Sequence, residues 1–298
     1  MYKGVFSPMV TVFDRKGDID YKANERVINN LIDNGIDGIL FLGSMGEFFT
    51  IPLNKKKEFI DFAVKAVDKR VAVLIGTGGT DVDEVVELTR YSHKAGADAA
   101  LVVSPYYFKL DDESLYRYFS QVAASADIDI ILYNFPDRTS VSLDAPLVTR
   151  LARDHKNIVG IKDTVDNISH TRKLIKAVKG EFEEFSILAG FDEYLVPNLM
   201  AGGDGVICGL TNIAPRLFSD IYAAYGRKDF DTVDTLQKKI YTLMQLYDVT
   251  QPFVGAIKAA TSMVLGGEIS YQVGKPGKAA DPEQAEKIRK ILGEAGLI

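Results

Sequence analysis

Lys162 is the residue of this 298-residue chain whose position most directly suggests chemistry. It lies near the end of the apolar run 157–163, which reads NIVGIKD and should form a strand that is buried on both faces. Burial removes water from a lysine amine and favours its neutral form, which can attack a carbonyl carbon. The alternative is a structural lysine that forms an ion pair with Asp163 or another carboxylate, and its position alone favours neither role.

Two hydroxyl groups lie at the ends of other apolar runs. Tyr133 closes the run 128–134, one strand–helix unit before Lys162, so adjacent parallel strands would bring the two residues side by side. A phenol there can move protons, although a packed aromatic ring is the alternative. Ser44 lies in the turn 43–47 (GSMGE), whose backbone N–H groups can hold a carboxylate; its alternative role is to cap an ordinary turn.

Eight short apolar runs alternate with segments of helical periodicity, which predicts eight strand–helix pairs. The expected strands are 5–12, 38–42, 71–76, 99–104, 128–134, 158–163, 186–190 and 205–209. The expected helices are 23–33, 55–67, 82–94, 114–126, 147–154, 169–178, 194–200 and 215–225. We therefore predict an α/β fold, a (β/α)8 TIM barrel with its active site at the carboxyl ends of the strands. An open doubly wound sheet is the alternative, but no G-x-G-x-x-G follows the first strand.

Three further helical segments, 229–246, 253–265 and 282–292, follow the eighth pair. We expect residues 1–225 to form the barrel and residues 226–298 to form a helical extension packed on it as one structural unit. Such terminal helices often serve contacts between subunits.

The composition argues against several classes of function. With 41 acidic and 35 basic residues the net charge is −6, so nucleic acid is not an expected partner. No apolar run approaches the roughly 20 residues that cross a bilayer, so we expect a cytoplasmic protein with no membrane contact. A single cysteine, Cys208, excludes an internal disulfide. His93, His155 and His170 fall in or beside predicted helices, so we expect no metal site.

The segments 43–47 (GSMGE), 133–136 (YNFP) and 160–163 (GIKD) together resemble the dihydrodipicolinate synthase and N-acetylneuraminate lyase family of class I aldolases. The resemblance covers nearly the whole chain. It implies pyruvate held as an enamine on Lys162, Tyr133 as the proton shuttle, and the pyruvate carboxylate on the Ser44–Met45 backbone. From its position after the second strand, the Ser44 hydroxyl can join Tyr133 in a proton relay. No cofactor beyond the lysine is implied.

The resemblance also implies that the protein works as an oligomer. Tyr107 matches the tyrosine that this family inserts into a neighbouring subunit's site to complete the proton relay. We therefore expect a homo-oligomer, a dimer of dimers, although an exposed loop aromatic is the alternative for Tyr107. Gly190 and Ile207 match backbone positions beside the pyruvate.

The residues that would face the second substrate point in two directions. Thr164, Asp192 and Glu193 resemble the residues that bind hydroxyl groups in the lyases and sugar-acid aldolases of the family, and several motifs most closely resemble the 2-keto-3-deoxygluconate aldolase branch. Arg138 instead matches the arginine with which dihydrodipicolinate synthases bind aspartate semialdehyde. Met45 departs from the synthase pattern, which has a hydroxyl residue at this position.

We therefore predict a pyruvate-dependent lyase that cleaves or forms a 2-keto-3-deoxy sugar acid from pyruvate and a glyceraldehyde-type aldehyde. Dihydrodipicolinate synthase is the first alternative. A non-catalytic 2-oxo-acid sensor, and a dehydratase or deaminase acting on another 2-oxo acid, also remain open. The positions of Phe48, Phe49, Leu53 and Lys56 do not carry the polar and histidine residues of the family's lysine-feedback site, so inhibition by lysine is not expected.

Overall fold

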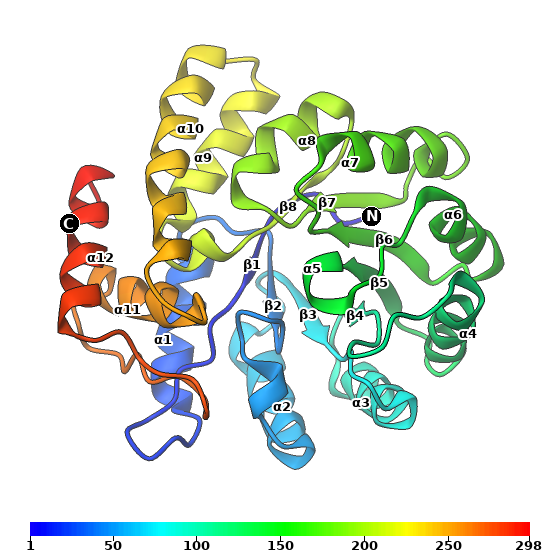
Figure 1. The fold of residues 1–298 in the computed structure, drawn as a ribbon, viewed down its shortest axis with the longest axis horizontal. Coiled ribbons are helices and arrows are strands. Elements are labelled where there is room, and N and C mark those ends of the chain that lie inside the picture. Colours follow the sequence, from blue (N-terminus) through cyan, green and yellow to red (C-terminus); the bar gives the residue numbers. More distant parts are fainter. The chain divides into compact units, whose positions relative to one another are not determined.

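Eight parallel strands form the sheet in a computed structural model that describes all residues 1–298 (Figure 1). They close into a barrel in sequence order. The prediction of an α/β barrel is confirmed, and the open doubly wound sheet is wrong. The strands are β1 (Gly4–Pro8), β2 (Gly38–Phe41), β3 (Ala72–Gly76), β4 (Ala99–Val103), β5 (Asp129–Asn134), β6 (Ile158–Asp163), β7 (Ser186–Ala189) and β8 (Gly205–Ile207).

The first of two compact units comprises Met1–Gly4 and Ala72–Ile207 and contains β3 to β8. Its helices pack in sequence order, α3 against α4, α4 against α6, α6 against α7 and α7 against α8. They are α3 (Val82–Ala95), α4 (Asp112–Ala123), α5 (Pro136–Thr139), α6 (Ala145–Asp154), α7 (Ile168–Leu174) and α8 (Leu195–Ala201). The parallel register between β5 and β6 pairs Tyr133 with Lys162 and Asn134 with Asp163.

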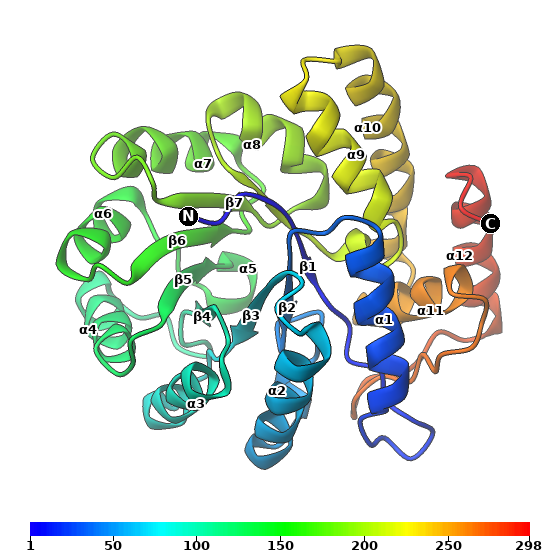
Figure 2. The same cartoon turned by 180° about the vertical axis from the view of Figure 1, so that it is seen from behind.

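The second unit comprises Val5–Val71 and Cys208–Ile298, with β1, β2 and the remaining helices. In Figure 2, α9 and α10 run side by side, and α11 packs against α12. The helices are α1 (Tyr21–Asp33), α2 (Leu53–Val67), α9 (Pro215–Gly226), α10 (Phe230–Met244), α11 (Val254–Val264) and α12 (Pro282–Glu294). The three predicted C-terminal helices are thus present. The division of the chain into a barrel of residues 1–225 and an extension of residues 226–298 stays a prediction.

Polar side chains decide where several elements begin and end. Helix α1 begins at Tyr21 because Asp20 caps it, accepting a hydrogen bond from the Ala23 N–H. Strand β1 ends at Pro8 rather than Val12. The Met9 N–H still donates to the Leu40 carbonyl at 2.9 Å, but side chains take over the donors of Val10 and Val12. Asn212 accepts from the Val10 N–H at 2.9 Å, and Asn24 accepts from the Val12 N–H at 3.0 Å.

The one-turn helix α5 was not predicted. It opens with Pro136, whose fixed φ suits the first turn of a helix and whose missing N–H costs nothing there. Four residues are too few to give a periodic pattern of apolar side chains, so this helix leaves no signal in the sequence. No helix of the protein combines the length and the apolar character that crossing a bilayer requires.

Candidate active site

Lys162 and Tyr133 lie side by side at the carboxyl ends of β6 and β5. Both side chains are buried, each 5% exposed, and the Lys162 Nζ lies 4.5 Å from the centroid of the Tyr133 ring. The ring of Tyr133 in turn stacks near Phe135. The Tyr133 ring is the contact that the Lys162 amine makes, and the amine forms neither an ion pair nor a hydrogen bond with the rest of the chain.

Asp163 does not pair with Lys162, although it is the next residue along β6. Successive side chains of a strand point to opposite faces of the sheet. The carboxylate of Asp163 contacts α7, where it accepts from the Thr171 hydroxyl at 2.8 Å and lies 3.1 Å from the His170 Nδ1. The alternative role for Lys162, an ion pair with Asp163, is therefore wrong.

Gly190 and Thr164 lie against each other beyond the ends of β7 and β6. A Cβ on Gly190 would lie 1.8 Å from the Thr164 Oγ1, so no other residue fits there without displacing the threonine. The Thr164 hydroxyl is buried and has no hydrogen-bond partner. A buried hydroxyl without a partner is costly, and a substrate oxygen can supply the missing bond. Ile207, the last residue of β8, is also fully buried.

Acidic residues cluster after β7, on the turn Asp192–Tyr194. Asp192 is buried, and Glu193 is half-buried, so desolvation and then the charge of Asp166 raise the pKa of Glu193 above its ordinary value. The hydroxyl of Tyr194 donates to Asp166, and this bond raises the pKa of Tyr194 to about 12. The turn therefore offers oxygen acceptors for hydroxyl groups.

Arg138 and Tyr107 are exposed residues of the same unit. Arg138 is on α5, where its guanidinium lies 5.3 Å from the Phe135 ring and forms no ion pair. Tyr107 follows β4, has 87% of its surface exposed, and adopts a φ of 94°, which is strained for a residue other than glycine. Its ring meets that of Phe108 edge to face. Neither side chain forms a hydrogen bond, ion pair or ring contact with Lys162 or Tyr133.

Ser44 and Met45 belong to the second unit, in the turn after β2. Ser44 is half-buried and Met45 is 6% exposed. The turn is anchored by Glu47, which has a left-handed φ of 56° and whose Oε1 accepts from the Lys258 Nζ at 2.6 Å. Its Oε2 accepts from the Gly274 N–H at 2.7 Å. A wholly buried ion pair therefore fixes the end of the segment that carries Ser44 and Met45.

The sequence of the chain matches the model of a known protein family. The model described as the dihydrodipicolinate synthetase family matches residues 1–295. The chain belongs to this family. The resemblance inferred from the GSMGE, YNFP and GIKD motifs is thus confirmed.

Relatives within the dihydrodipicolinate synthetase family include two from Escherichia coli (strain K12). YagE, a candidate 2-dehydro-3-deoxy-D-gluconate aldolase, is 37% identical over 297 residues, covering 100% of this chain and 98% of YagE. YjhH, a candidate 2-dehydro-3-deoxy-D-pentonate aldolase, is 38% identical over 297 residues with the same coverage. A 4-hydroxy-tetrahydrodipicolinate synthase from Hydrogenobaculum sp. (strain Y04AAS1) is 33% identical over 298 residues and covers 100% of both chains.

The crystal structure of YagE in complex with pyruvate resembles this dihydrodipicolinate synthetase family member throughout. The two share a TM-score of 0.98 at 37% identity, and the match covers 100% of both chains. The protein is thus an enzyme, a lyase of the dihydrodipicolinate synthetase family with a TIM-barrel fold.

Sequence reasoning missed the roles of four polar residues of this lyase. Lys258 is a lone lysine in the apolar segment FVGAIKAATSMV, a pattern that signals a buried charge with a partner elsewhere. Asn134 and Asp163 directly follow Tyr133 and Lys162, so strand alternation places them together on the other face of the sheet. His170, read only as unsuited to metal binding, is their neighbour on α7.

Proposed function

We propose that this lyase forms a Schiff base between Lys162 and the carbonyl carbon of pyruvate. The observation that carries the proposal is the amine of Lys162, which is buried, has no acidic partner and lies 4.5 Å from the ring of Tyr133. A lysine held in this way keeps its amine free of an ion pair, so the nitrogen is available to attack a carbonyl carbon. The pyruvate complex of YagE supports the same substrate here.

The reaction follows from the two groups. The neutral amine of Lys162 adds to the C2 carbonyl of a 2-keto-3-deoxy acid, and the carbinolamine loses water to give an imine. Tyr133 gives its phenol proton to the departing water, so the imine is left protonated and Tyr133 is left as a phenolate. The phenolate then accepts the proton of the C4 hydroxyl while the C3–C4 bond breaks, and the bond electrons move into the protonated imine to form an enamine and an aldehyde. Protonation of the enamine at C3 and addition of water then release pyruvate and restore the amine. No cofactor takes part.

The pyruvate carboxylate is proposed to bind the backbone of Ser44 and Met45, with Ser44 in the proton relay. This assignment rests on the tight turn between Gly43 and Glu47, whose end is fixed by the buried ion pair of Glu47 with Lys258. Gly190 and Ile207 are proposed to line the pyruvate. Tyr107 is proposed to complete the relay in a neighbouring subunit of a homo-oligomer, a dimer of dimers, which its 87% exposure permits.

A 2-keto-3-deoxy sugar acid is the proposed substrate, with a glyceraldehyde-type aldehyde as the second product. Its hydroxyl groups match the unpartnered hydroxyl of Thr164 and the acceptors of Asp192 and Glu193. The names of YagE and YjhH point to the same substrate class.

Condensation of pyruvate with aspartate semialdehyde is a second candidate, as in 4-hydroxy-tetrahydrodipicolinate synthases. The observation in its favour is Arg138, whose guanidinium has no acidic partner and is free to bind a carboxylate. The Hydrogenobaculum relative carries this activity in its name.

A direct comparison of the two reactions tests the substrate proposal. Pyruvate release from 2-keto-3-deoxygluconate and 2-keto-3-deoxypentonates would be followed at equal enzyme concentration, beside the loss of pyruvate with aspartate semialdehyde. We expect the sugar acids to have the higher kcat/KM. A higher kcat/KM with aspartate semialdehyde would favour the synthase. Pyruvate binding without turnover of either substrate would favour a dehydratase or deaminase that acts on another 2-oxo acid.

A further inference from the structure

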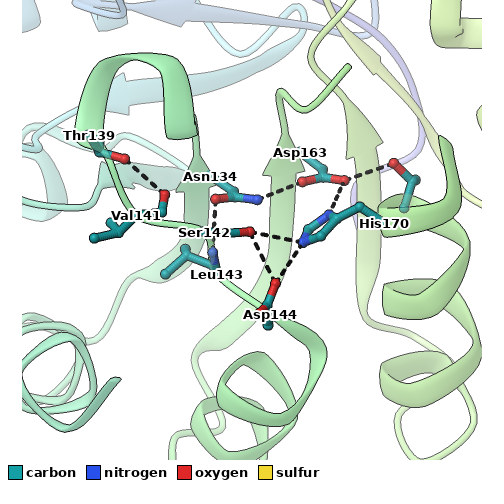
Figure 3. Close-up of polar contacts among 9 residues, drawn as sticks. Asn134, Thr139, Val141, Ser142, Leu143, Asp144, Asp163 and His170 are labelled. Atoms are coloured by element: carbon teal, nitrogen blue, oxygen red, sulfur yellow. Dashed lines mark hydrogen bonds and ion pairs between the residues drawn. The ribbon is translucent and has the colours of Figure 1, made fainter. Parts of the chain in front are cut away.

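A hydrogen-bonded pair of side chains ties β5 to β6 immediately after the Tyr133–Lys162 pair. Asn134 and Asp163 are register partners, and the Asn134 Nδ2 donates to the Asp163 Oδ1 at 2.8 Å (Figure 3). Both residues are buried, and the Asp163 side chain is fully so. A buried carboxylate that takes no part in the proposed chemistry requires a structural reason, because its desolvation is costly.

The second oxygen of Asp163 holds the start of α7. The Thr171 hydroxyl donates to the Asp163 Oδ2 at 2.8 Å, and the His170 Nδ1 lies 3.1 Å from the same oxygen. The bond to Asp163 is the main cause that raises the pKa of His170, so its doubly protonated form is favoured. With one oxygen for β5 and one for α7, the carboxylate is held in a single orientation.

The tie continues to the segment that follows α5. The Asn134 Oδ1 accepts from the Leu143 N–H at 2.9 Å, and the His170 Nε2 lies 3.2 Å from both the Ser142 Oγ and the Asp144 Oδ1. Figure 3 shows these side chains meeting between β5, β6 and α7. Every polar atom of the Asn134 and Asp163 side chains therefore has a hydrogen-bond partner, and only one N–H of the Asn134 amide is left over.

The reactive pair itself has no comparable link. The contact between the Lys162 Nζ and the Tyr133 ring is a cation–π or amine–π contact without a hydrogen bond, which is weakly directional. The relative placement of the two groups is therefore set by the register and separation of their strands. The backbone bond from the Thr164 N–H to the Asn134 carbonyl, 2.9 Å long, continues the pairing just past the pair.

We propose that Asn134 and Asp163 are positioning residues that hold Tyr133 at the distance from Lys162 that proton transfer to and from the Schiff base requires. The inference rests on the proposed function. Neither residue touches the substrate in this proposal, and both act through the strand ends that carry the reactive pair. A misplacement of about 1 Å at a reacting centre can cost on the order of 100-fold in rate, so a tie at this point has a large effect.

The chain offers a reciprocal test, because the amide and the carboxylate can be exchanged. In Asp163→Asn, the new amide oxygen can still accept from Thr171, but its NH2 group then faces the NH2 group of Asn134. In Asn134→Asp, two carboxylates face each other. The double variant Asn134→Asp/Asp163→Asn restores one amide–carboxylate bond and leaves acceptors for Leu143 and Thr171. All three variants would be compared with the wild type in sugar-acid cleavage and in the rate of borohydride trapping with pyruvate.

We expect each single variant to lower kcat and the trapping rate by about 10- to 100-fold with a smaller change in KM, and the double variant to regain most of the loss. His170→Gln is the matched control, because it removes a partner of Asp163 without touching the tie between strands, and it should retain nearly wild-type rates. Should a single variant fail to fold, trapping in the double variant close to the wild-type rate supports the proposal.

Single variants at wild-type rates would overturn the proposal, as would a double variant no faster than the singles or a loss in His170→Gln as large as in Asp163→Asn. These failures are distinct from a failure of the proposed function. If pyruvate is trapped on the wild-type enzyme but the exchange shows no rescue, only the positioning role is wrong. If the wild type is not trapped at all, the Schiff base itself is wrong.

Discussion

Two buried lysines of this lyase have opposite surroundings. Lys258, on α11, is 1% exposed and its Nζ lies 2.6 Å from the Glu47 Oε1, with the Phe13 ring at 4.3 Å. Lys162, on β6, is 5% exposed and has an aromatic ring beside it but no carboxylate. Burial alone therefore does not mark a lysine as reactive. Our proposal for Lys162 rests instead on the lack of an acidic partner, because a buried ion pair is what gives Lys258 a structural role.

The groups around each lysine differ in what they do to its charge. Burial lowers the pKa of Lys258, but the charge of Glu47 and its hydrogen bond work in the opposite direction and keep a pair together. That pair joins α11 to the turn that carries Ser44 and Met45. The carboxylate nearest to Lys162 in the sequence is that of Asp163, and it points to the other face of the sheet.

The largest expected effect comes from Lys162→Met. Removal of a covalent nucleophile should lower turnover on the order of 10⁴-fold or more. Because the lysine has no partner to leave behind, the free energy of unfolding should stay the same or rise. Sugar-acid cleavage and denaturant unfolding would be measured on the same preparation. Loss of stability together with activity would mean that Lys162 holds the fold, and the contrast with Lys258 would disappear.

The same substitution at the other lysine should act on the fold. Lys258→Met leaves the buried carboxylate of Glu47 without its cation, which typically costs about 3–5 kcal/mol of unfolding free energy. Glu47→Gln/Lys258→Met should recover much of this loss, because neither residue is then charged. Urea unfolding monitored by circular dichroism would measure both variants. A Lys258→Met protein as stable as the wild type would refute the structural role of the pair.

Thr164 extends the comparison to a hydroxyl, since its Oγ1 is also buried without a partner. Thr164→Val removes the hydroxyl and keeps the shape of the side chain. We expect kcat/KM for the sugar acid to fall by about 10- to 100-fold, equivalent to one lost hydrogen bond to substrate. The rate of pyruvate trapping by borohydride should change little. An equal loss in both assays would place Thr164 at the pyruvate rather than at the sugar hydroxyls.

The smallest expected effect is a change in stability with pH, and it comes from His170, which pairs with the carboxylate of Asp163. The pKa of His170 is raised above its ordinary value of 6.5, mainly by the bond to Asp163 and further by Asp144. A histidine of this kind stabilises the fold fully below its unfolded pKa and loses that contribution as the pH rises through its folded pKa.

Unfolding of the wild type and His170→Gln would therefore be compared across this pH range. The difference in unfolding free energy should be largest at acid pH and shrink above pH 6.5. A difference that grows with pH would show that His170 is neutral where it meets Asp163.

The sequence predicted the parts of the site that local patterns encode. Tyr133 and Lys162 end successive apolar runs, and parallel pairing places such ends together, so their contact followed from the strand count. The buried ion pair did not follow, because Glu47 and Lys258 are 211 residues apart and no local pattern links them. Helix α5 was too short to show a period, and side-chain capping of the Val10 and Val12 donors shortened β1 in a way that hydrophobicity does not reveal.

The central claim is that the unpaired Lys162 is the nucleophile. The most direct test is borohydride reduction in the presence of pyruvate, followed by intact and peptide mass spectrometry of the wild type, Lys162→Ala and Lys258→Met. We predict a single adduct on the peptide that contains Lys162, retained in Lys258→Met and absent from Lys162→Ala. An adduct on another lysine, or none on the wild type, would contradict this assignment.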